Sequence, residues 1–354
     1  MAQRCMNVMV GVLLILVSYT VFLDVRYPFQ VEDLFDHELD IPIEKKREWN
    51  VVKKRVDFRK NDTQRHCDVY NASRPYTVDF FCVQTKTKPS ATVCLYTEFE
   101  DIYISHDLKY TGKWEPHVLK DYQQILSRNP DLGVLDLGAN IGYYTLLAAK
   151  MGHKVVAVEP YFPSIYRIHR ALQMEQLSDQ VTVVHNAVSD KRVLGTIRRS
   201  GDNQGDTRVD MEYHKCIGSC PPPVQTILLD DLLEVIPFNY SILKVDIQGY
   251  ECQAFTHSEK LFKALEIPYV FMEWGVMREH YQSENYTSAD KYRVQQLIKT
   301  MFDQSYRPYS HSDDGYKPLD PHQWHLWPFD IIWQQTLKSK EYGKVLRTHF
   351  LNWP

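Results

Sequence analysis

Residues 134–145 read VLDLGANIGYYT, in which an apolar strand pattern stops at a small-residue turn and continues directly into a helical pattern. Gly138 and Gly142 permit backbone angles and close approaches that a Cβ atom would prevent. The free N–H groups at the start of the following helix point towards any ligand bound beside the turn. This arrangement predicts a nucleotide-like pocket, with Asp136 at the strand end and Asn140 in the turn.

A second strand pattern, at residues 154–158, ends in Glu159, about twenty positions after the glycine turn. An acidic side chain at this strand tip is placed to accept hydrogen bonds from both hydroxyls of a ribose. The alternative is that Glu159 caps the next helix. Residues 143–145 stand where a dinucleotide fingerprint has its third glycine, so the pattern favours a smaller adenosyl ligand over NAD.

A third segment, residues 242–251, reads ILKVDIQGYE and places Lys244, Asp246 and Gln248 on one face of a strand by alternation. Together with the first motif it resembles the FkbM family of S-adenosylmethionine-dependent methyltransferases. That family has the forms D-[IV]-G-A-N-x-G and K-[IV]-D-[IV]-E-G-x-E in these two places. The resemblance covers roughly residues 132–274. Gln248 departs from it, because the family usually has Glu there, so the catalytic base is not placed at this position.

The resemblance implies a class I methyltransferase domain, Rossmann-like in fold, with S-adenosylmethionine as its cofactor. The cofactor-binding residues expected on this basis are Asp136, Gly138, Asn140, Gly142, Glu159, Asn186 and Asp246. Within this set, Asp136 and the glycine turn hold the amino-acid part of the cofactor, Glu159 holds the ribose, and Asn186 or its neighbours flank the adenine.

Methyl transfer from a sulfonium to a hydroxyl requires that donor and acceptor be held in line and that a proton be removed. Asp246 is the first candidate for the general base or for the group that orients the acceptor. Lys244 is its expected ion-pair partner, with a buried structural pair as the alternative. Glu273 is the second candidate base, and His185, which is also explained as a packed core residue, is the third.

From residue 131 to residue 354 short apolar strand patterns alternate with helical patterns. This alternation predicts an α/β domain with a mostly parallel sheet and helices on both faces. Ligands of such sheets bind at the carboxyl ends of the strands, where Asp136, Glu159 and Asp246 all lie. The expected strands are 134–137, 154–158, 181–185, a pair within 188–199, 224–229, 242–247 and 269–273, and the expected helices are 141–151, 163–176, 230–236 and 251–264.

The chain before this domain divides into four parts. Residues 67–130 are a small β-containing lead-in segment, with strand patterns in YTVDFFCVQT, ATVCLYT and DIYIS, and a helix over 114–128. Residues 24–66 are charged and read as a stem. Residues 8–23 are an uncharged apolar run that would span roughly 24 Å as a helix, which suits a signal anchor in the thinner early secretory membranes. Residues 1–7 then form a cytosolic tail, and a cleaved signal peptide is the alternative.

The N-glycosylation sequons and the cysteines agree with a location of the chain beyond residue 23 in the lumen of the secretory pathway. The N-x-[S/T] sequons lie at Asn61, Asn71, Asn239 and Asn285. The first two are the favoured glycan sites, whereas Asn239 is expected to be too closely packed. The cysteines beyond the anchor are Cys67, Cys82, Cys94, Cys216, Cys220 and Cys252. They permit one disulfide among the first three and a small loop closed by Cys216 and Cys220, with Cys252 as a buried thiol. No zinc-type grouping occurs, so no metal is predicted.

The net charge and the aromatic content of the chain limit the kinds of binding partner that we expect. The net charge is −4 with mixed signs, so no nucleic-acid footprint is indicated. Aromatic residues make up 13% of the chain, and their rings serve either as sugar-stacking surfaces or as core. Residues 322–333 are rich in tryptophan and either form an acceptor platform with Tyr306 and Tyr309, or form an edge strand with Ile331 and Trp333 turned inward.

The expected function is that of a single-pass type II membrane protein of the Golgi or secretory pathway whose luminal domain is an O-methyltransferase for a glycan or other hydroxyl-bearing acceptor. One alternative is a Golgi glycosyltransferase, although the D-x-D motif of many such enzymes is absent from the chain. Another is a protein that binds S-adenosylmethionine without turnover, which Gln248 suggests.

Overall fold

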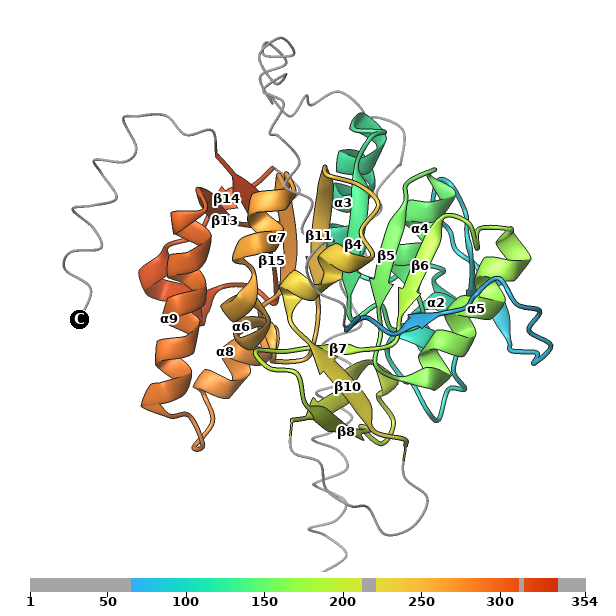
Figure 1. Ribbon diagram of the computed structural model, residues 1–354, viewed down its shortest axis with the longest axis horizontal. Helices are drawn as coiled ribbons and strands as arrows, with labels where there is room; N and C mark the ends of the chain where they lie inside the picture. The colour runs from blue at the N-terminus through green and yellow to red at the C-terminus, as the bar shows by residue number, and fades with distance from the viewer. Residues whose placement is uncertain (1–64, 212–220, 312–314, 337–354) are drawn as a thin grey trace, which may run out of the picture. The chain divides into compact units, whose positions relative to one another are not determined.

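The strands expected at 134–137, 154–158, 181–185, 242–247 and 269–273 assemble into one central sheet in the computed structural model, which describes residues 65–211, 221–311 and 315–336 (Figure 1). The strand expected at 224–229 belongs instead to a second, smaller sheet. In spatial order the strands of the central sheet are β1 (Val69–Tyr70), β6 (Val181–Val184), β5 (Val155–Val158), β4 (Gly133–Leu137), β11 (Ser241–Val245), β12 (Tyr269–Glu273), β15 (Asp330–Gln335), β13 (Tyr306–Ser310) and β14 (Lys317–Pro318). The strands from β6 to β12 run parallel, whereas β1 and β15 are antiparallel to their neighbours. The prediction of a mostly parallel sheet is confirmed.

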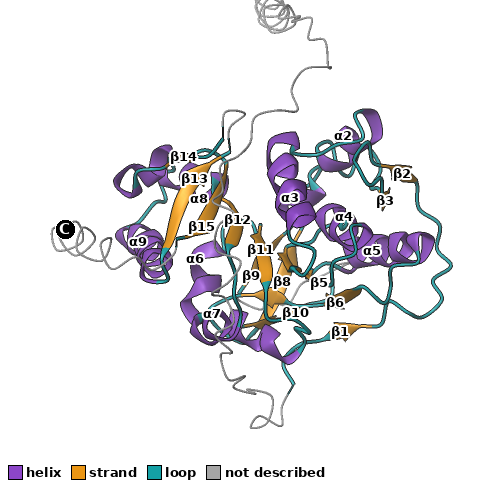
Figure 2. Cartoon of the chain, turned by 90° about the horizontal axis from the view of Figure 1, so that it is seen from above, coloured by secondary structure: helices purple, strands orange, loops and turns teal. Residues whose placement is uncertain are grey.

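Helices cover both faces of this sheet (Figure 2). The described α-helices are α2 (Ile104–Tyr110), α3 (Pro116–Arg128), α4 (Tyr143–Lys150), α5 (Phe162–Glu175), α6 (Glu251–Ala254), α7 (Glu259–Ala264), α8 (Gly275–Tyr281) and α9 (Ser288–Asp303). Helices α3, α4 and α5 contribute to one apolar cluster, and α7 and α9 contribute to the other. Successive strand residues enter different clusters: Val134 packs on the α4 side and Leu135 on the α7 side. This alternation explains why the central strands are apolar throughout.

The carboxyl ends of the parallel strands lie beside a smaller sheet, labelled in part below the central sheet in Figure 1. Its strands, in spatial order, are β7 (Ala187–Val188), β10 (Val224–Ile227), β8 (Leu194–Arg198) and β9 (Arg208–Asp210). Strand β7 follows β6 after a short turn, so the chain leaves the central sheet and enters the small one at the ligand-binding edge. The strand pair expected within residues 188–199 is thus divided between β7 and β8.

The lead-in segment is built into the same structure. Strand β1 forms an edge of the central sheet by pairing with β6. A hairpin of β2 (Cys82–Gln84) and β3 (Thr92–Cys94) packs on α5. Cys82 and Cys94 face each other across this hairpin and form a disulfide, which confirms the expectation of one pair among the first three cysteines beyond the anchor. Cys67 and Cys252 are free thiols, while Cys216 and Cys220 lie outside the described residues.

Two elements differ from the prediction, because polar side chains form hydrogen bonds with backbone groups there and so change the local secondary structure. The DIYIS stretch is a helix start and not a strand, since the carboxylate of Asp101 accepts the backbone N–H groups of Tyr103, Ile104 and Ser105 ahead of α2. The helix expected over 251–264 is divided into α6, a 3-10 turn η4 (Phe255–His257) and α7. The break occurs where the Ser258 hydroxyl donates to the Phe255 carbonyl.

Two further corrections concern an expected helix and the end of the chain. Residues 230–236 were expected to be an α-helix, but this segment is a 3-10 helix, η3 (Leu229–Glu234). The expected edge strand at the C-terminal end is an inner strand, because β15 lies between β12 and β13. Ile331, Ile332 and Trp333 are therefore fully buried on both faces.

The expected membrane anchor (8–23) and cytosolic tail lie outside the described residues, as does almost all of the stem, including Asn61. Within the described ranges, none of the helices combines the length and the apolar character that crossing a bilayer requires. Asn71 and Asn285 are exposed at the surface. Asn239 is exposed as well, which corrects the expectation that it is closely packed: it lies in the turn ahead of β11 and not within the strand.

Candidate functional site

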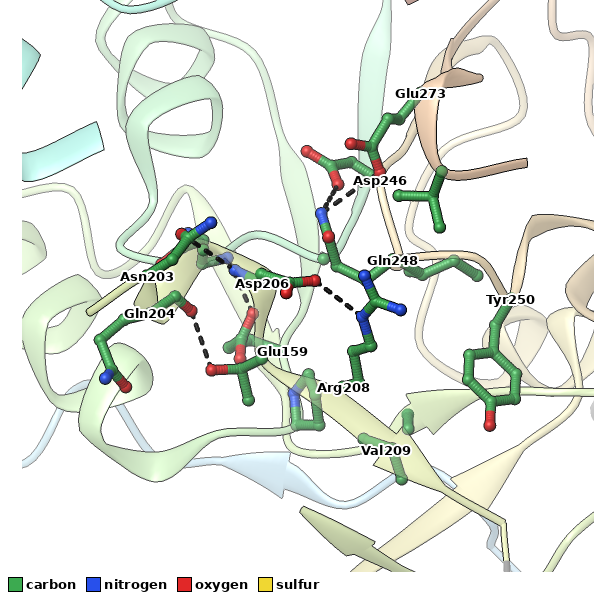
Figure 3. A pocket seen from close by; sticks show the side chains of 18 of the residues that line it. Glu159, Asn203, Gln204, Asp206, Arg208, Val209, Asp246, Gln248, Tyr250 and Glu273 are labelled. Carbon is green, nitrogen blue, oxygen red and sulfur yellow. Dashed lines mark hydrogen bonds and ion pairs between the residues drawn. The ribbon is translucent and has the colours of Figure 1, made fainter. Parts of the chain in front are cut away.

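A cavity of about 460 Å³ opens at the carboxyl ends of β4, β5, β11 and β12 (Figure 3). The residues expected at the site that line it are Gly138, Asn140, Glu159, Asn186, Asp246 and Glu273. The small sheet closes one side through Val188 and Val209, and the lead-in segment contributes Ile104 and Trp114. Segments far apart in the chain therefore meet here because parallel strands end at one common edge.

Strand β4 delivers the chain into the cavity through Gly138. This residue has a φ of 78°, which L side chains rarely adopt, and a Cβ atom built on it would lie 1.8 Å from the Asp246 carbonyl oxygen. Gly142, with a φ of 85°, is the N-cap of α4, so the helix begins two residues later than expected. The turn of β4 thus touches the residue that follows β11, and the two motifs form one wall.

Glu159 lies at the end of β5 and is 5% exposed. Its two carboxylate oxygens accept the backbone N–H groups of Asn140, at 2.8 Å, and of Tyr161, at 2.9 Å. Burial raises the pKa of Glu159 to about 7, against the opposing effect of these two hydrogen bonds. The side chain is therefore fixed from the protein side while it also lines the cavity.

Two of the expected cofactor residues are engaged by the protein itself. Asp136 is 1% exposed and accepts a 2.6 Å hydrogen bond from the Thr145 hydroxyl of α4. It is not among the residues that line the cavity, which departs from the expected rim of three converging acids. Asn186 lines the cavity, but its amide accepts from the Asp68 N–H and donates to the Gln225 carbonyl. Its neighbours Ala187 and Val188 offer an apolar wall instead.

The residues expected to be catalytic form a hydrogen-bonded cluster at the end of β11 and β12. The Lys244 ammonium lies 3.2 Å from one carboxylate oxygen of Asp246, and the Gln248 amide donates to the other at 2.7 Å. The same amide nitrogen donates to Glu273 at 3.2 Å (Figure 3). Burial, followed by the charge of Asp246, holds the pKa of Glu273 well above its usual range.

Lys244 does not reach the cavity. It is 7% exposed and lies over the Tyr144 ring, 4.9 Å from its centroid. Burial alone would lower the pKa of Lys244, but the charges of Asp246, Asp136 and Glu115 together raise it, so the ammonium stays charged. Lys244 is thus a buried counter-ion that stabilises the Asp246 carboxylate without lining the cavity itself.

Two acidic residues of the site were not selected from the sequence. Glu115 precedes α3, lines the cavity and accepts the Tyr144 hydroxyl at 2.7 Å. The only local signal was Pro116, which marks a helix start. Glu251 is the last residue of the ILKVDIQGYE segment and accepts the backbone N–H groups of Ile247 and Gly249. Its position in the motif was a usable signal, and it holds the loop that carries Gln248.

The remaining expectations for acceptor residues are corrected. Trp324, Trp327 and Trp333 are buried, with Trp327 and Trp333 in ring contact with Trp274, and Tyr306 is fully buried as well. The aromatic stretch is therefore core, and within 322–333 only Phe329 lines the cavity. His185 stacks on Phe162 and bonds to Asp68 and to the Pro160 carbonyl, and it does not line the cavity.

One group of potential metal ligands occurs in the part of the chain that the structure describes, away from the cavity. It comprises His66, Asp231 and Glu234. Arg192 makes two hydrogen bonds to the Asp231 carboxylate, and the backbone N–H groups of His66 and Cys67 donate to Glu234. The carboxylate oxygens of Asp231 and Glu234 thus already accept hydrogen bonds from the protein, and those of Glu234 hold the lead-in segment against η3.

The cavity fits an adenosyl sulfonium. Among the described residues that line it, Asn140 and Gln204 each hold a buried side-chain oxygen without a protein partner, so hydrogen-bond acceptors face a ligand there. Carboxylates of Glu159, Asp246 and Glu273 surround the same space, which favours a cation. When bound, the cofactor supplies an electrophilic methyl group, with Glu159 and the Gly138 turn as the residues that would hold it.

Comparisons with known proteins agree with this site. Residues 136–308 match the family model described as the methyltransferase FkbM domain. No curated protein matches the chain. Similar solved structures include an O-methyltransferase from Bacillus cereus in complex with SAH, at 13% identity and a TM-score of 0.36, covering 63% of this chain and 83% of that one. Methyltransferase FkbM from Methylobacillus flagellatus KT is 14% identical with a TM-score of 0.36, covering 68% and 56%.

The strand order and the match together give a class I methyltransferase-like α/β fold, and S-adenosylmethionine is the cofactor. The glycine turn, Glu159 and the β11 segment that carried the resemblance all fall within the matched range or at its start. Residues 136–308 are therefore a methyltransferase FkbM domain, which confirms the resemblance found in the two motifs.

Proposed function

We propose that this methyltransferase transfers its methyl group to a hydroxyl of a glycan, and that it acts as a membrane-anchored enzyme in the lumen of the Golgi or secretory pathway. One observation carries the proposal for a hydroxyl acceptor: Asp246 lines the cavity, and its backbone carbonyl lies against the glycine turn that would hold the donor. A base so placed can take the proton that a hydroxyl loses as it attacks.

The roles of the residues follow from their contacts. Lys244 and Gln248 each donate to Asp246, so its carboxylate is held in one orientation while it accepts the hydroxyl proton. Glu273 lies beside Asp246, accepts a hydrogen bond from the same Gln248 amide and lines the same cavity, where it can hydrogen-bond a second hydroxyl of the acceptor. Alignment of donor and acceptor then supplies most of the remaining acceleration.

A sugar as acceptor is supported by the rings on the cavity wall. Tyr103, Trp114, Tyr250 and Phe329 line it, and aromatic faces stack on the apolar faces of sugar rings. The disulfide between Cys82 and Cys94 supports an oxidising compartment, because such bonds are rare in the cytosol. Exposed sequons at Asn71 and Asn285 are consistent with the same compartment.

The proposal is tested with the full-length protein in detergent, S-adenosylmethionine labelled in its methyl group, and glycans released from secreted glycoproteins. We expect label in the glycan as a methyl ether that survives mild base, and we expect Asp246→Asn to reduce its formation at least 100-fold. Base-labile label would identify a carboxylate acceptor and contradict the hydroxyl proposal. Base-stable label confined to lipid or protein would contradict the glycan.

A further inference from the structure

Gln248 occupies the cavity wall in a backbone conformation that its residue type rarely adopts. Its φ is 56°, in the left-handed region, and Gly249 follows with a φ of 94°. A non-glycine residue adopts this region at a cost in free energy, and such strain persists only where the surroundings impose it. Here Glu251 imposes it by accepting the N–H groups on either side, from Ile247 and Gly249.

The strained turn directs the Gln248 amide between two carboxylates. Its nitrogen lies 2.7 Å from an Asp246 oxygen and 3.2 Å from a Glu273 oxygen (Figure 3). An amide nitrogen carries two hydrogens, so one can serve each carboxylate at once. A glutamate at this position, which matches the family pattern, offers no N–H donor and adds a third acid to the pair.

We propose that Gln248 is a positioning residue: its neutral amide bridges Asp246 and Glu273 and so holds the Asp246 carboxylate oriented beside the methyl donor. The hydrogen bond donated to Glu273 favours the anion of that carboxyl group, against the burial that raises its pKa. The effect of Gln248 on binding of the methyl donor depends only on S-adenosylmethionine being the cofactor. Its effect on an acceptor hydroxyl rests, in addition, on the proposed function.

Other charged groups act on the same pair from each neighbouring element and stay unchanged in the test. They are Lys244 on β11, Asp136 on β4, Glu159 after β5, Glu115 before α3, Glu251 on α6 and Asp330 on β15. Lys244 is the cation among these and it bonds only the Asp246 side of the pair. Asp246 and Glu273 also share a direct side-chain hydrogen bond, which raises the pKa of Glu273 further. The amide of Gln248 donates to both of these carboxyl groups.

The experiment compares binding of S-adenosylmethionine with binding of its product S-adenosylhomocysteine by calorimetry between pH 5 and pH 9, using the full-length protein in detergent. The two ligands share their amino-acid and adenosine parts and differ in the positive charge at sulfur. The ratio of their dissociation constants therefore reports negative charge near the sulfur, once each constant is corrected for the titration of its ligand's α-amino group, which the sulfonium makes more acidic in S-adenosylmethionine.

In the natural protein we expect preference for the cationic ligand to grow with pH as Glu273 ionises, because burial holds the pKa of Glu273 well above its usual range. Gln248→Met keeps the side-chain length and removes both donors, so the midpoint of this growth should move up by about one pH unit. Gln248→Glu should move it at least as far. The matched control is Gln176→Met, because Gln176 also has a left-handed φ, of 57°, but lies at the end of α5 and does not line the cavity.

Two results would overturn the proposal. One is an unchanged midpoint in Gln248→Met, with S-adenosylhomocysteine still bound to show that the site is folded. The other is a loss of affinity by the same factor for both ligands at every pH, which is what a purely structural role predicts. A shifted midpoint without any glycan methylation would support Gln248 as the bridge and contradict only the proposed acceptor.

Discussion

Gly138 illustrates how a single residue connects two parts of the site, the turn after β4 that would hold the cofactor and the turn after β11 that carries Asp246. Its backbone lies against the Asp246 carbonyl so closely that a methyl group does not fit. A side chain there has to move the turn after β4 away from the turn after β11. Because both turns line the cavity, the damage falls on the ligand site and spares the apolar core.

Gly138→Ala is therefore expected to weaken S-adenosylmethionine binding at least 10-fold. The matched control is Gly152→Ala, since Gly152 also has a positive φ, of 96°, but a Cβ atom there meets nothing within 4 Å. The control should lose about 1 kcal/mol of stability and bind the cofactor normally. Calorimetry and urea unfolding measure the two effects, and equal cofactor affinity in both variants would contradict the argument.

Substitutions of Glu159 and of Asp246 are expected to affect different properties, cofactor affinity for the first and methyl transfer for the second. Glu159→Ala removes an acceptor facing the cofactor side, so cofactor affinity should fall by 10-fold or more. Asp246→Asn keeps shape and hydrogen bonding to Lys244, so the affinity should change only a few-fold while transfer is lost. Binding and single-turnover measurements separate the two. Normal turnover by Asp246→Asn would show that the base lies elsewhere in the cavity.

At the scale of elements, the site depends on strand register. Leu137 of β4 pairs with Val245 of β11, so the next residues of each strand, Gly138 and Asp246, meet in space. The lead-in segment then covers this edge, and Ile104 and Trp114 close the cavity from outside the matched family range. The hairpin of β2 and β3 anchors that cover on α5.

Removing the disulfide tests this anchoring. Replacing both Cys82 and Cys94 by alanine should cost roughly 2 to 3 kcal/mol, because the bond closes a loop between residues 12 apart in sequence. Hydrogen exchange should quicken first in β3 and in the adjoining lead-in segment. The control Cys252→Ala removes a free thiol and should leave this exchange unchanged. Uniform acceleration over the whole sheet would contradict a local role.

At the scale of the whole molecule, buried carboxyl groups make stability depend on pH. Burial raises the pKa of Glu159 and of Glu251 to about 7. Both values lie above the usual range of a glutamate, so between about pH 4.5 and pH 7 the folded state binds more protons than the unfolded state. This contribution to stability is complete below that interval and is lost as the pH rises through it.

The ligand-free protein should therefore have a higher Tm near pH 5 than near pH 8. Glu251→Gln replaces a fully buried carboxyl by a neutral amide and should flatten this slope, mainly by raising the Tm at pH 8. Glu259→Gln, at an exposed side chain of α7, is the control and should leave the slope as it is. Parallel profiles for the natural protein and Glu251→Gln would contradict the prediction.

The sequence by itself determined the alternation of strands and helices from β4 to β12, the glycine turn and the acids at the strand ends, but not the helices α8 and α9 that follow. These are local properties: apolar alternation, special backbone angles and the residue that follows each strand. It also indicated one disulfide among Cys67, Cys82 and Cys94, because these are close in the chain, and the structure identifies the pair as Cys82 and Cys94. Gln248 stood out as a departure from the family pattern, although its position between two carboxylates could not be derived from that.

Only the tertiary structure decided which polar groups reach the cavity. Asp136 and Lys244 belong to the motifs, yet both are turned away from it, one bonded to α4 and the other beneath Asp246. Glu115 reaches the same cavity from the lead-in segment without any motif. The reason is physical: a strand residue's direction follows from alternation, whereas contacts between distant segments depend on how helices and loops pack over the sheet edge.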